Sequence, residues 1–398
     1  MCRVIDKKGN ELFESDPVNE TTRLLRDLVR LPSINPMGRD LPPEHLYEHR
    51  VTAYLESFFR DLGVPVERQA VAPLRENIIA RCDLGGRRTY LFEVHQDTVP
   101  VDHMTIDPFG AVIDNGRLYG RGACDIKGGM AAMLTAFARL AKEKPAGAAN
   151  VILACSVDEE HTFFGVQRMV KNGLRADGAI VAEPTSLRIV QAHKGAVRWH
   201  VTTPGRACHS STPELGINAI YRMGRLLTLI ERYAERLRAS RTDPLLGPPT
   251  LSVGCIEGGS SVNTIPDFCR IHVDRRLVPG EDSAAALAAF NDALRAEVDL
   301  PFDYSEPWID LPSLPADAPP GKVEFVRRFG AFLDRALGRH ECIAVPYGTD
   351  ASTLSQAGIP ALVFGPGDIA QAHTRDEWVD LAEVERAAEL LFRFACEG

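Results

Sequence analysis

Short apolar runs alternate with amphipathic stretches through the first half of the chain. Residues 90–94, 150–157 and 179–182 are largely apolar and are predicted to be buried strands. Between the first two runs, apolar side chains recur at helical spacing from Met130 to Leu140. Residues 44–62 and the stretch from Val18 to Arg30 are further predicted helices. Strands that alternate with helices predict an α/β fold, with a mixed, mostly parallel sheet flanked by helices.

The pattern changes at about Ile189, where a second kind of region begins. From there we predict a strand, a helix at 218–238, strands at 250–256 and 268–277, and a helix at 283–298. This β-α-β-β-α order suggests a small ferredoxin-like α+β insert. A proline-rich linker at 312–320 then returns the chain to the first region. We therefore expect one domain built from residues 1–188 and 309–398, with the insert formed by 189–308.

Composition and charge narrow the class of protein. The 398 residues carry 45 basic and 54 acidic side chains, a formal net charge of −9, which argues against nucleic acid or an anionic membrane as a partner. Nine cysteines, from Cys2 to Cys396, are scattered without a C-x-x-C pair, which fits a reducing compartment. We see no signal peptide and no run long enough to span a bilayer, so we expect a cytoplasmic protein.

Ionisable side chains follow each predicted strand of the first region. His95 comes directly after residues 90–94, Glu159 and Glu160 follow 150–157, and Glu183 follows 179–182. Asp125 lies in a glycine-rich turn, G-R-G-A-C-D-I-K-G-G, that lacks the ending of a phosphate-binding loop. A structural turn, a helix cap or a solvated acidic loop would explain any one of these pieces. Because ligand sites gather at the carboxyl ends of parallel strands, we expect these ionisable side chains to meet in one site.

Two imidazoles and three carboxylates form the candidate ligand set for a metal: His95, Asp125, Glu160, Glu183 and His373. These ligand types suit zinc, with cobalt or manganese as alternatives. Five ligands are too many for one tetrahedral zinc ion that must keep an open position. They fit two divalent metal ions about 3.5–4 Å apart, bridged by one carboxylate and a water.

The neighbouring residues suggest hydrolysis of an amide bond. Asp97, two residues after His95, can orient its ring. Glu159 adjoins a candidate ligand and can act as the general base that takes a proton from the water and passes it to the leaving amine. Within the insert, His209 could donate to the oxyanion and Arg276 could hold a substrate carboxylate. A lone exposed His or Arg is more often an ordinary surface residue, so these two assignments rest on weaker signals.

Seven short motifs occur in one order along nearly the whole chain. They are H-Q-D-T-V-P from His95, the glycine-rich turn around Asp125, D-E-E at 158–160, A-E-P-T around Glu183, H-S at His209, N-T-I-P from Asn263, and A-H at 372–373. With these motifs the chain resembles the co-catalytic zinc metallopeptidases. That family includes acetylornithine deacetylase, succinyl-diaminopimelate desuccinylase, aminoacylase and glutamate carboxypeptidase.

The resemblance implies how the ligands divide between two metals. His95, Asp125 and Glu183 would bind one, and Asp125, Glu160 and His373 the other. Asp97 would orient His95, Glu159 would be the base, and a cis peptide would follow Asp125. The fold would be that of the zinc aminopeptidases and carboxypeptidases.

The resemblance also assigns the insert as a lid and dimerisation domain. His209 and Asn263 would reach the active site of the partner subunit, so the protein would be a homodimer.

Two positions depart from the family pattern, since Val94 and Ala182 stand where glycine is usual. Both leave the candidate ligands intact.

We expect a metal-dependent hydrolase of linear amide bonds that removes the acyl group from an N-acyl-L-amino acid. Glu183, where some relatives have Asp, favours the deacetylase and desuccinylase branch, and N-acetylornithine is the first candidate substrate. A desuccinylase, or a metallodipeptidase or carboxypeptidase on the same scaffold, is the nearest alternative. A non-catalytic binding protein is a remote one, because such a protein would not need Glu159 beside a full ligand set.

Overall fold

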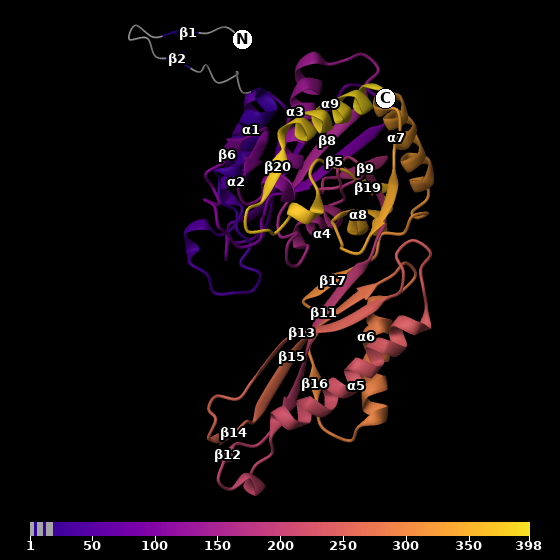
Figure 1. Cartoon of the computed structure of the whole chain (residues 1–398). Helices are drawn as coiled ribbons and strands as arrows, with labels where there is room; N and C mark the ends of the chain where they lie inside the picture. The colour runs from indigo at the N-terminus through magenta and orange to yellow at the C-terminus, as the bar shows by residue number, and fades with distance from the viewer. Residues whose placement is uncertain (1–3, 6–10, 13–18) are drawn as a thin grey trace. The chain divides into compact units, whose positions relative to one another are not determined.

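The computed structural model describes residues 4–5, 11–12 and 19–398 (Figure 1). Cys2 and Val18 lie outside the described residues. The chain divides into two compact units. The first unit comprises the described residues up to 156 together with 182–187 and 364–398, and the second comprises 157–181 and 188–363. The domain boundaries expected at 188/189 and 308/309 stay a prediction.

The first unit contributes four neighbouring strands to a mixed sheet, in the order β5-β8-β4-β3. They are β3 (Val66–Ala72), β4 (Arg75–Cys82), β5 (Thr89–His95) and β8 (Asn150–Ser156). β5 and β8 run parallel, with His95 opposite Ser156, whereas β4 pairs antiparallel with both of its neighbours. Because β5 and β8 end in register, the segments after these two strands start at the same edge of the sheet.

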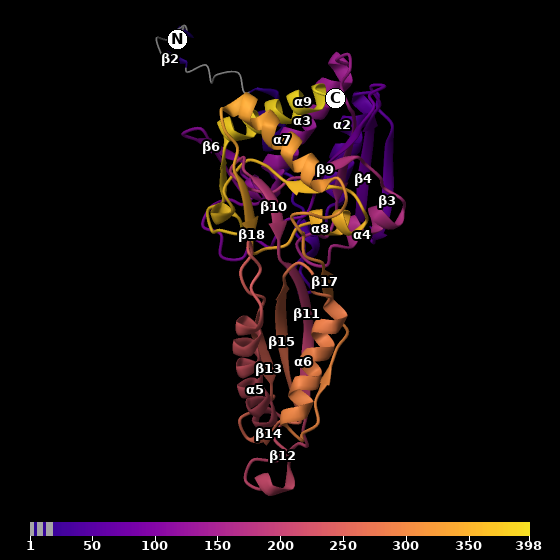
Figure 2. The same cartoon turned by 90° about the vertical axis from the view of Figure 1, so that its right-hand side faces the viewer.

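Helices cover this sheet, and the main ones are α1 (Glu20–Val29), α2 (His49–Asp61), α3 (Gly128–Glu143) and α9 (Leu381–Cys396). α3 is buried along nearly its whole length and packs beside α9 (Figure 2). The ring of Tyr90 on β5 stacks on Phe394 of α9 at 5.0 Å between centroids. Aromatic rings therefore join the sheet to the last helix of the chain.

Small elements complete the first unit. A three-stranded sheet has the order β20-β7-β6, from β6 (Val112–Asp114), β7 (Arg117–Tyr119) and β20 (Trp378–Asp380). β1 (Val4–Ile5) pairs antiparallel with β2 (Glu11–Leu12). Single helical turns occur at η1 (Pro43–His45) and η4 (Ile369–Gln371), and η2 (Ala123–Lys127) is a turn whose backbone is not helical at Asp125 and Ile126. The helix expected at 44–62 begins only at His49, because Tyr47 has a φ of 64°, which a helix cannot accommodate.

Four strands of the second unit pair in the order β18-β10-β19-β9. They are β9 (Gly178–Val181), β10 (Ile189–His193), β18 (Cys342–Val345) and β19 (Ala361–Val363). β10/β18 and β19/β9 are parallel pairs, and β10/β19 is antiparallel. Helices α4 (Phe164–Lys171), α7 (Lys322–Leu337) and α8 (Ala351–Gln356) belong to the same unit.

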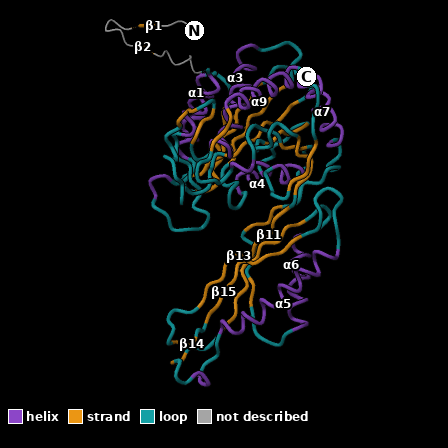
Figure 3. Tube along the Cα trace, viewed as in Figure 1, coloured by secondary structure: helices purple, strands orange, loops and turns teal. Residues whose placement is uncertain are grey.

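The second unit also contains an antiparallel sheet with the order β13-β15-β11-β16, in which β17 is also paired to β11 (Figure 3). Its elements are β11 (Gly195–Pro204), α5 (Ala219–Ser240), β13 (Thr250–Gly258), β15 (Phe268–Leu277), α6 (Ser283–Glu297), β16 (Asp303–Tyr304) and β17 (Ile309–Leu311). This connectivity is the predicted ferredoxin-like one. Its helices pack on the sheet around Trp199 and Phe290, whose rings meet edge to face at 5.1 Å.

A short strand pair, β12 (Cys208–His209) with β14 (Thr264–Ile265), and the turn η3 (Pro213–Leu215) extend from this region. The single strand expected after Ile189 is two strands, β10 and β11, which belong to different sheets and are separated by Lys194. The mixed α/β class with helix-flanked sheets is confirmed.

Candidate active site

Four chain segments of the first unit bring ionisable side chains to one place. His95 is the last residue of β5, Asp125 lies in the turn between β7 and α3, and Glu183 lies in the short segment 182–187. The amide of Ala182 donates to the carbonyl of Glu93 at 2.9 Å, which sets Glu183 beside the end of β5. His373 approaches from the loop between η4 and β20. The predicted strand-end cluster is thus present for these residues.

Asp125 is the centre of the cluster. Its Oδ1 lies 3.2 Å from Nε2 of His95, and its Oδ2 lies 3.3 Å from Nε2 of His373. Glu183 Oε1 is 3.9 Å from Nε2 of His95. Asp125, His95 and Glu183 are buried, at 6%, 2% and 4% exposure, whereas His373 is exposed. Each oxygen of one buried carboxylate therefore faces a different imidazole.

The ring of His95 lies against both the backbone and the carboxylate of Asp97, the residue expected to orient it. His95 Nδ1 lies 3.0 Å from the backbone oxygen of Asp97 and 3.6 Å from the carboxylate Oδ1. An Nδ1–H that donates to the backbone oxygen leaves the lone pair of Nε2 facing Asp125. Nε2 lies 3.2 Å from the Asp125 oxygen, so one cation could bind both atoms.

The pKa values of the two aspartates are low despite burial. Burial alone would raise the pKa of Asp97, but His95, Arg75 and Asn35 lower it to about 2. Asn35 contributes a hydrogen bond of 2.8 Å to Asp97 Oδ2. Burial likewise opposes ionisation of Asp125, whereas the imidazoles of His373 and His95 hold its pKa below the usual range. Both carboxylates are therefore charged at neutral pH.

A buried ion pair lies behind Asp97, and sequence reasoning missed it. Arg75 places Nε 3.1 Å and 3.0 Å from the two oxygens of Glu48, and its Nη2 lies 3.8 Å from Asp97 Oδ2. Burial raises the pKa of Glu48 to about 7, with Arg75 opposing the shift. No local pattern joins these residues, since Arg75 and Glu48 are 27 positions apart in separate elements.

The Asp125 turn is tightly constrained. A cis peptide joins Asp125 to Ile126, as the resemblance implied. Gly122 has a φ of +84°, and a Cβ there would lie 2.7 Å from Thr98 Cγ2, so another residue would not fit without a shift. The glycine-rich sequence therefore serves the backbone path that carries Asp125.

The donor set fits divalent metal ions. Within the part of the chain that the structure describes, Asp125 Oδ1 is buried and accepts no hydrogen bond. Imidazole nitrogen and carboxylate oxygen are the ligands that zinc and its neighbours take. The oxygens of Asp125, each beside one imidazole, suit a bridging position between two such ions.

The acidic triplet after β8 belongs to the second unit, which begins at Val157. Asp158 and Glu159 are buried, at 4% and 7% exposure, so the alternative of a solvated loop is wrong for them. The carbonyl of Asp158 accepts from the amides of Thr162 and Phe163 at 3.2 Å and 2.7 Å, which closes a tight turn. Glu160 is partly buried in the same turn.

The structure brings two of the three predicted residues of the insert together and separates the third. His209 on β12 and Asn263 before β14 are neighbours, since Ser210 N donates to the Asn263 carbonyl at 3.0 Å. Both are exposed, and His209 Nδ1 lies 2.7 Å from the hydroxyl of Ser211. Arg276 is at the far end of β15, where its Nε donates to Asp274 at 2.8 Å.

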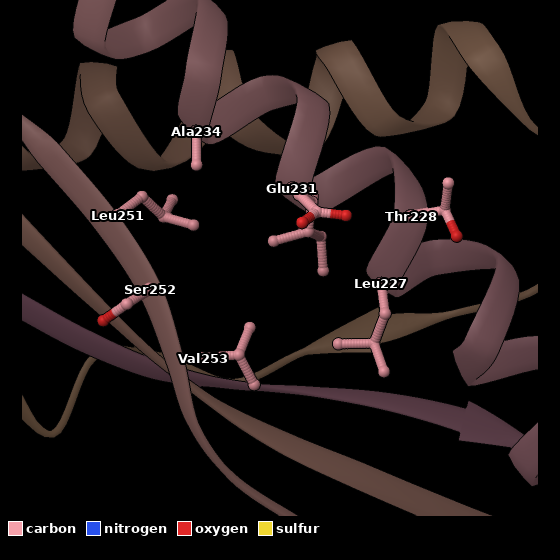
Figure 4. A pocket seen from close by; sticks show the side chains of 8 residues that line it. Leu227, Thr228, Glu231, Ala234, Leu251, Ser252 and Val253 are labelled. Atoms are coloured by element: carbon pink, nitrogen blue, oxygen red, sulfur yellow. The ribbon is translucent and has the colours of Figure 1, made fainter.

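A cavity of about 390 Å³ lies between α5 and β13 (Figure 4). Leu227, Leu251 and Val253 line it together with the carboxylate of Glu231, and none of the predicted site residues takes part.

Over the described residues, no helix combines the length and the apolar character that crossing a membrane requires.

Comparison with known proteins gives a consistent result. The family described as Peptidase family M20/M25/M40 matches residues 91–397. The acetylornithine deacetylase of Proteus mirabilis (strain HI4320) is 32% identical over 375 residues, which cover 92% of this chain and 94% of the relative. That of Vibrio cholerae serotype O1 (strain M66-2) is 32% identical over 352 residues, covering 86% and 90%.

Solved structures share the fold. An M20 family metallo-carboxypeptidase, Sso-CP2 from Sulfolobus solfataricus, superposes with a TM-score of 0.76 at 20% identity, over 95% of this chain and 99% of that one. Human carnosine dipeptidase 1 gives a TM-score of 0.72 at 17% identity, over 95% and 96%.

Proposed function

We propose, since this chain belongs to peptidase family M20/M25/M40, that it removes the acyl group from an N-acyl-L-amino acid. Family membership and the relatives make the chain a metallohydrolase that acts on amide bonds. N-acetylornithine is our first candidate substrate, because relatives named acetylornithine deacetylase align over 92% of the chain. The observation that carries the proposal is the buried Asp125 carboxylate between two imidazoles.

In this proposal, His95, Asp125 and Glu183 hold one divalent metal ion, and Asp125, Glu160 and His373 hold the other. Zinc is the expected metal, with cobalt or manganese as alternatives. When bound, such ions lower the pKa of a water and polarise the carbonyl of the substrate. The backbone oxygen of Asp97 keeps the Nδ1 proton of His95 in place, so that Nε2 presents its lone pair.

Chain connectivity supports a role for Glu159 and Glu160. Ser156 pairs directly with His95, and Glu160 follows Ser156 by only four residues, which span at most about 14 Å. Glu159 would take the proton of the attacking water and deliver it to the leaving amine.

We further propose that the protein works as a homodimer through the insert. Arg276 and the segment with His209 lie toward opposite ends of β15, which at its length of 10 residues spans about 34 Å. A small substrate held by Arg276 through its carboxylate therefore cannot also reach His209 of the same chain. If His209 donates to the oxyanion, it must come from a second copy, and Asn263 beside it would come from that copy too.

We also propose a cytoplasmic location. The eight cysteines within the described residues are all free thiols, which agrees with a reducing compartment.

The test is amine release from a panel of N-acyl amino acids by the purified wild-type chain. The panel contains N-acetylornithine, N-succinyl-diaminopimelate and a simple dipeptide, each with added zinc, with added cobalt and with chelator. We expect N-acetylornithine to be hydrolysed, the activity to vanish with chelator, and zinc or cobalt to restore it. The methyl ester of N-acetylornithine is the matched control, since it lacks the carboxylate that Arg276 would hold.

Preference for the succinyl substrate or the dipeptide would replace the deacetylase assignment with one of its alternatives on the same scaffold. No turnover of any member, with metal shown to be bound, would contradict the enzyme and favour a binding protein.

A further inference from the structure

A buried carboxylate beside the candidate site takes no part in the proposed chemistry. Glu377 is fully buried and precedes β20, four residues after His373. Its Oε2 accepts from Arg121 Nη1 at 2.6 Å and from the amide of Gly122 at 3.1 Å. Its Oε1 accepts from the amides of Cys124 and Asp125 at 2.9 Å and 3.0 Å. One side chain thus binds three backbone amides of a single turn.

Those amides have few other partners available. Asp125 has φ −119° and ψ 89°, and Ile126 has φ −140°, so the turn is not helical and cannot satisfy its amides as α3 does. A carboxylate that accepts backbone N–H groups makes stronger bonds than a neutral acceptor would. Several amides of one turn around one anion form a rigid nest. Glu377 therefore fixes the orientation of the peptide that carries Asp125.

Glu377 also ties down the segment that carries His373. Its own carbonyl accepts from the amide of Gly120 at 3.0 Å, and the next residue, Trp378, pairs with Tyr119 in the small sheet. Glu377 therefore contacts both the turn that carries Asp125 and the segment that follows His373. The side chains of these two residues approach each other to 3.3 Å, between His373 Nε2 and Asp125 Oδ2.

We propose that Glu377 is a positioning residue that sets the spacing of Asp125 and His373 for the metal ions, without touching metal or substrate itself. This inference rests on the proposed function, because it assumes that those two residues are ligands. A merely structural carboxylate would stabilise the fold equally but would leave metal affinity unchanged in a chain that still folds.

The experiment compares Glu377→Gln with a matched control, Glu281→Gln. Glu281 in the second unit also accepts from one arginine and one backbone amide, from Arg275 Nη2 at 2.7 Å and Val278 N at 2.8 Å. The metal-free chains are titrated with zinc, and with cobalt whose absorption spectrum reports ligand geometry. We expect Glu377→Gln to bind metal about 10–100-fold more weakly, with an altered cobalt spectrum. Glu281→Gln should match the wild type in both readouts.

A second variant guards against loss of the fold. Glu377→Asp keeps the charge and withdraws the carboxylate by one methylene, so we expect a folded chain with several-fold weaker metal binding. Wild-type metal affinity in either folded variant would overturn the positioning role while leaving the proposed function intact. A wild-type chain that binds no divalent metal would overturn the proposed function and this inference together.

Discussion

Two buried regions of the molecule are built from opposite materials. Near the end of β5, the first unit buries His95, Asp97 and Asp125, whereas the antiparallel sheet of the second unit buries Trp199 and Phe290. Burying apolar surface stabilises a fold, but burying charge costs free energy that its partners only partly return. Under the proposed function, the first region serves chemistry and the second serves stability. Substitutions in the first region should therefore change turnover or metal binding, whereas substitutions in the second should change the free energy of unfolding.

The largest effect is expected from the proposed base. Glu159→Gln removes the proton acceptor while preserving shape, so turnover should fall by about 10²–10⁴-fold with metal still bound. Amine release and metal content per chain measure the two quantities. Glu160→Gln is the control, because loss of a ligand should release metal as well. A variant at Glu159 that keeps its turnover would refute the assigned base.

A core substitution should give the reverse result. Trp199→Ala removes the largest ring from the core of the antiparallel sheet, where it contacts Phe290. We expect the free energy of unfolding to fall by about 3–5 kcal/mol, with metal affinity unchanged. Denaturant unfolding and metal titration check this, and Val262→Ala at a fully exposed position is the control. A change in metal affinity for Trp199→Ala would break the comparison.

His193 sharpens the comparison because it is a buried ionisable group that serves the fold. Its Nδ1 lies 2.9 Å from the Lys194 carbonyl and its Nε2 lies 3.1 Å from the Thr349 hydroxyl. Burial lowers the pKa of His193 to about 3 from 6.5. Between these values the unfolded chain binds a proton that the folded chain does not, so stability falls as pH falls from 6.5 toward 3.

From pH 6.5 to 5, this residue alone should cost about 2 kcal/mol of stability. His193→Gln cannot take up the proton, so its free energy of unfolding should vary less over that range. Denaturant unfolding of both proteins at several pH values measures the slopes. Equal slopes would show that His193 is not the source of the acid sensitivity.

The smallest effect concerns a helix cap. Asp282 begins α6 and accepts from the amide of Ala285 at 2.8 Å. Asp282→Ala should lower the free energy of unfolding by about 1 kcal/mol, and Asp282→Asn should recover most of it because it keeps the acceptor. Neither should alter metal affinity. Equal stability of the two variants would show that the cap contributes little.

Local patterns account for what the sequence could predict. A buried strand that ends in His95, and another followed by Glu159, are visible because apolar runs and the ionisable residues after them are adjacent. The ferredoxin-like connectivity was predictable because each element carries its own periodicity. Strands of only three residues, such as β6, β7 and β20, have too few positions to show one.

The supporting residues could not be predicted for another reason. Glu377 meets Asp125 across 252 positions, and Arg75 meets Glu48 across 27. A charged residue with a distant partner has the same appearance in a sequence as one on the surface. Only the fold distinguishes these two cases. Glu377 supports Asp125 and Arg75 supports Asp97, two residues that local motifs had already identified.

The proposed two-metal site is tested by measuring metal stoichiometry together with turnover. The wild-type chain would be stripped of metal, titrated with zinc, and assayed for amine release from N-acetylornithine at each step. The proposed two-metal mechanism predicts binding of two zinc ions per chain, with turnover absent in the stripped chain and restored as the ions bind. Undiminished turnover by the fully stripped chain would contradict it.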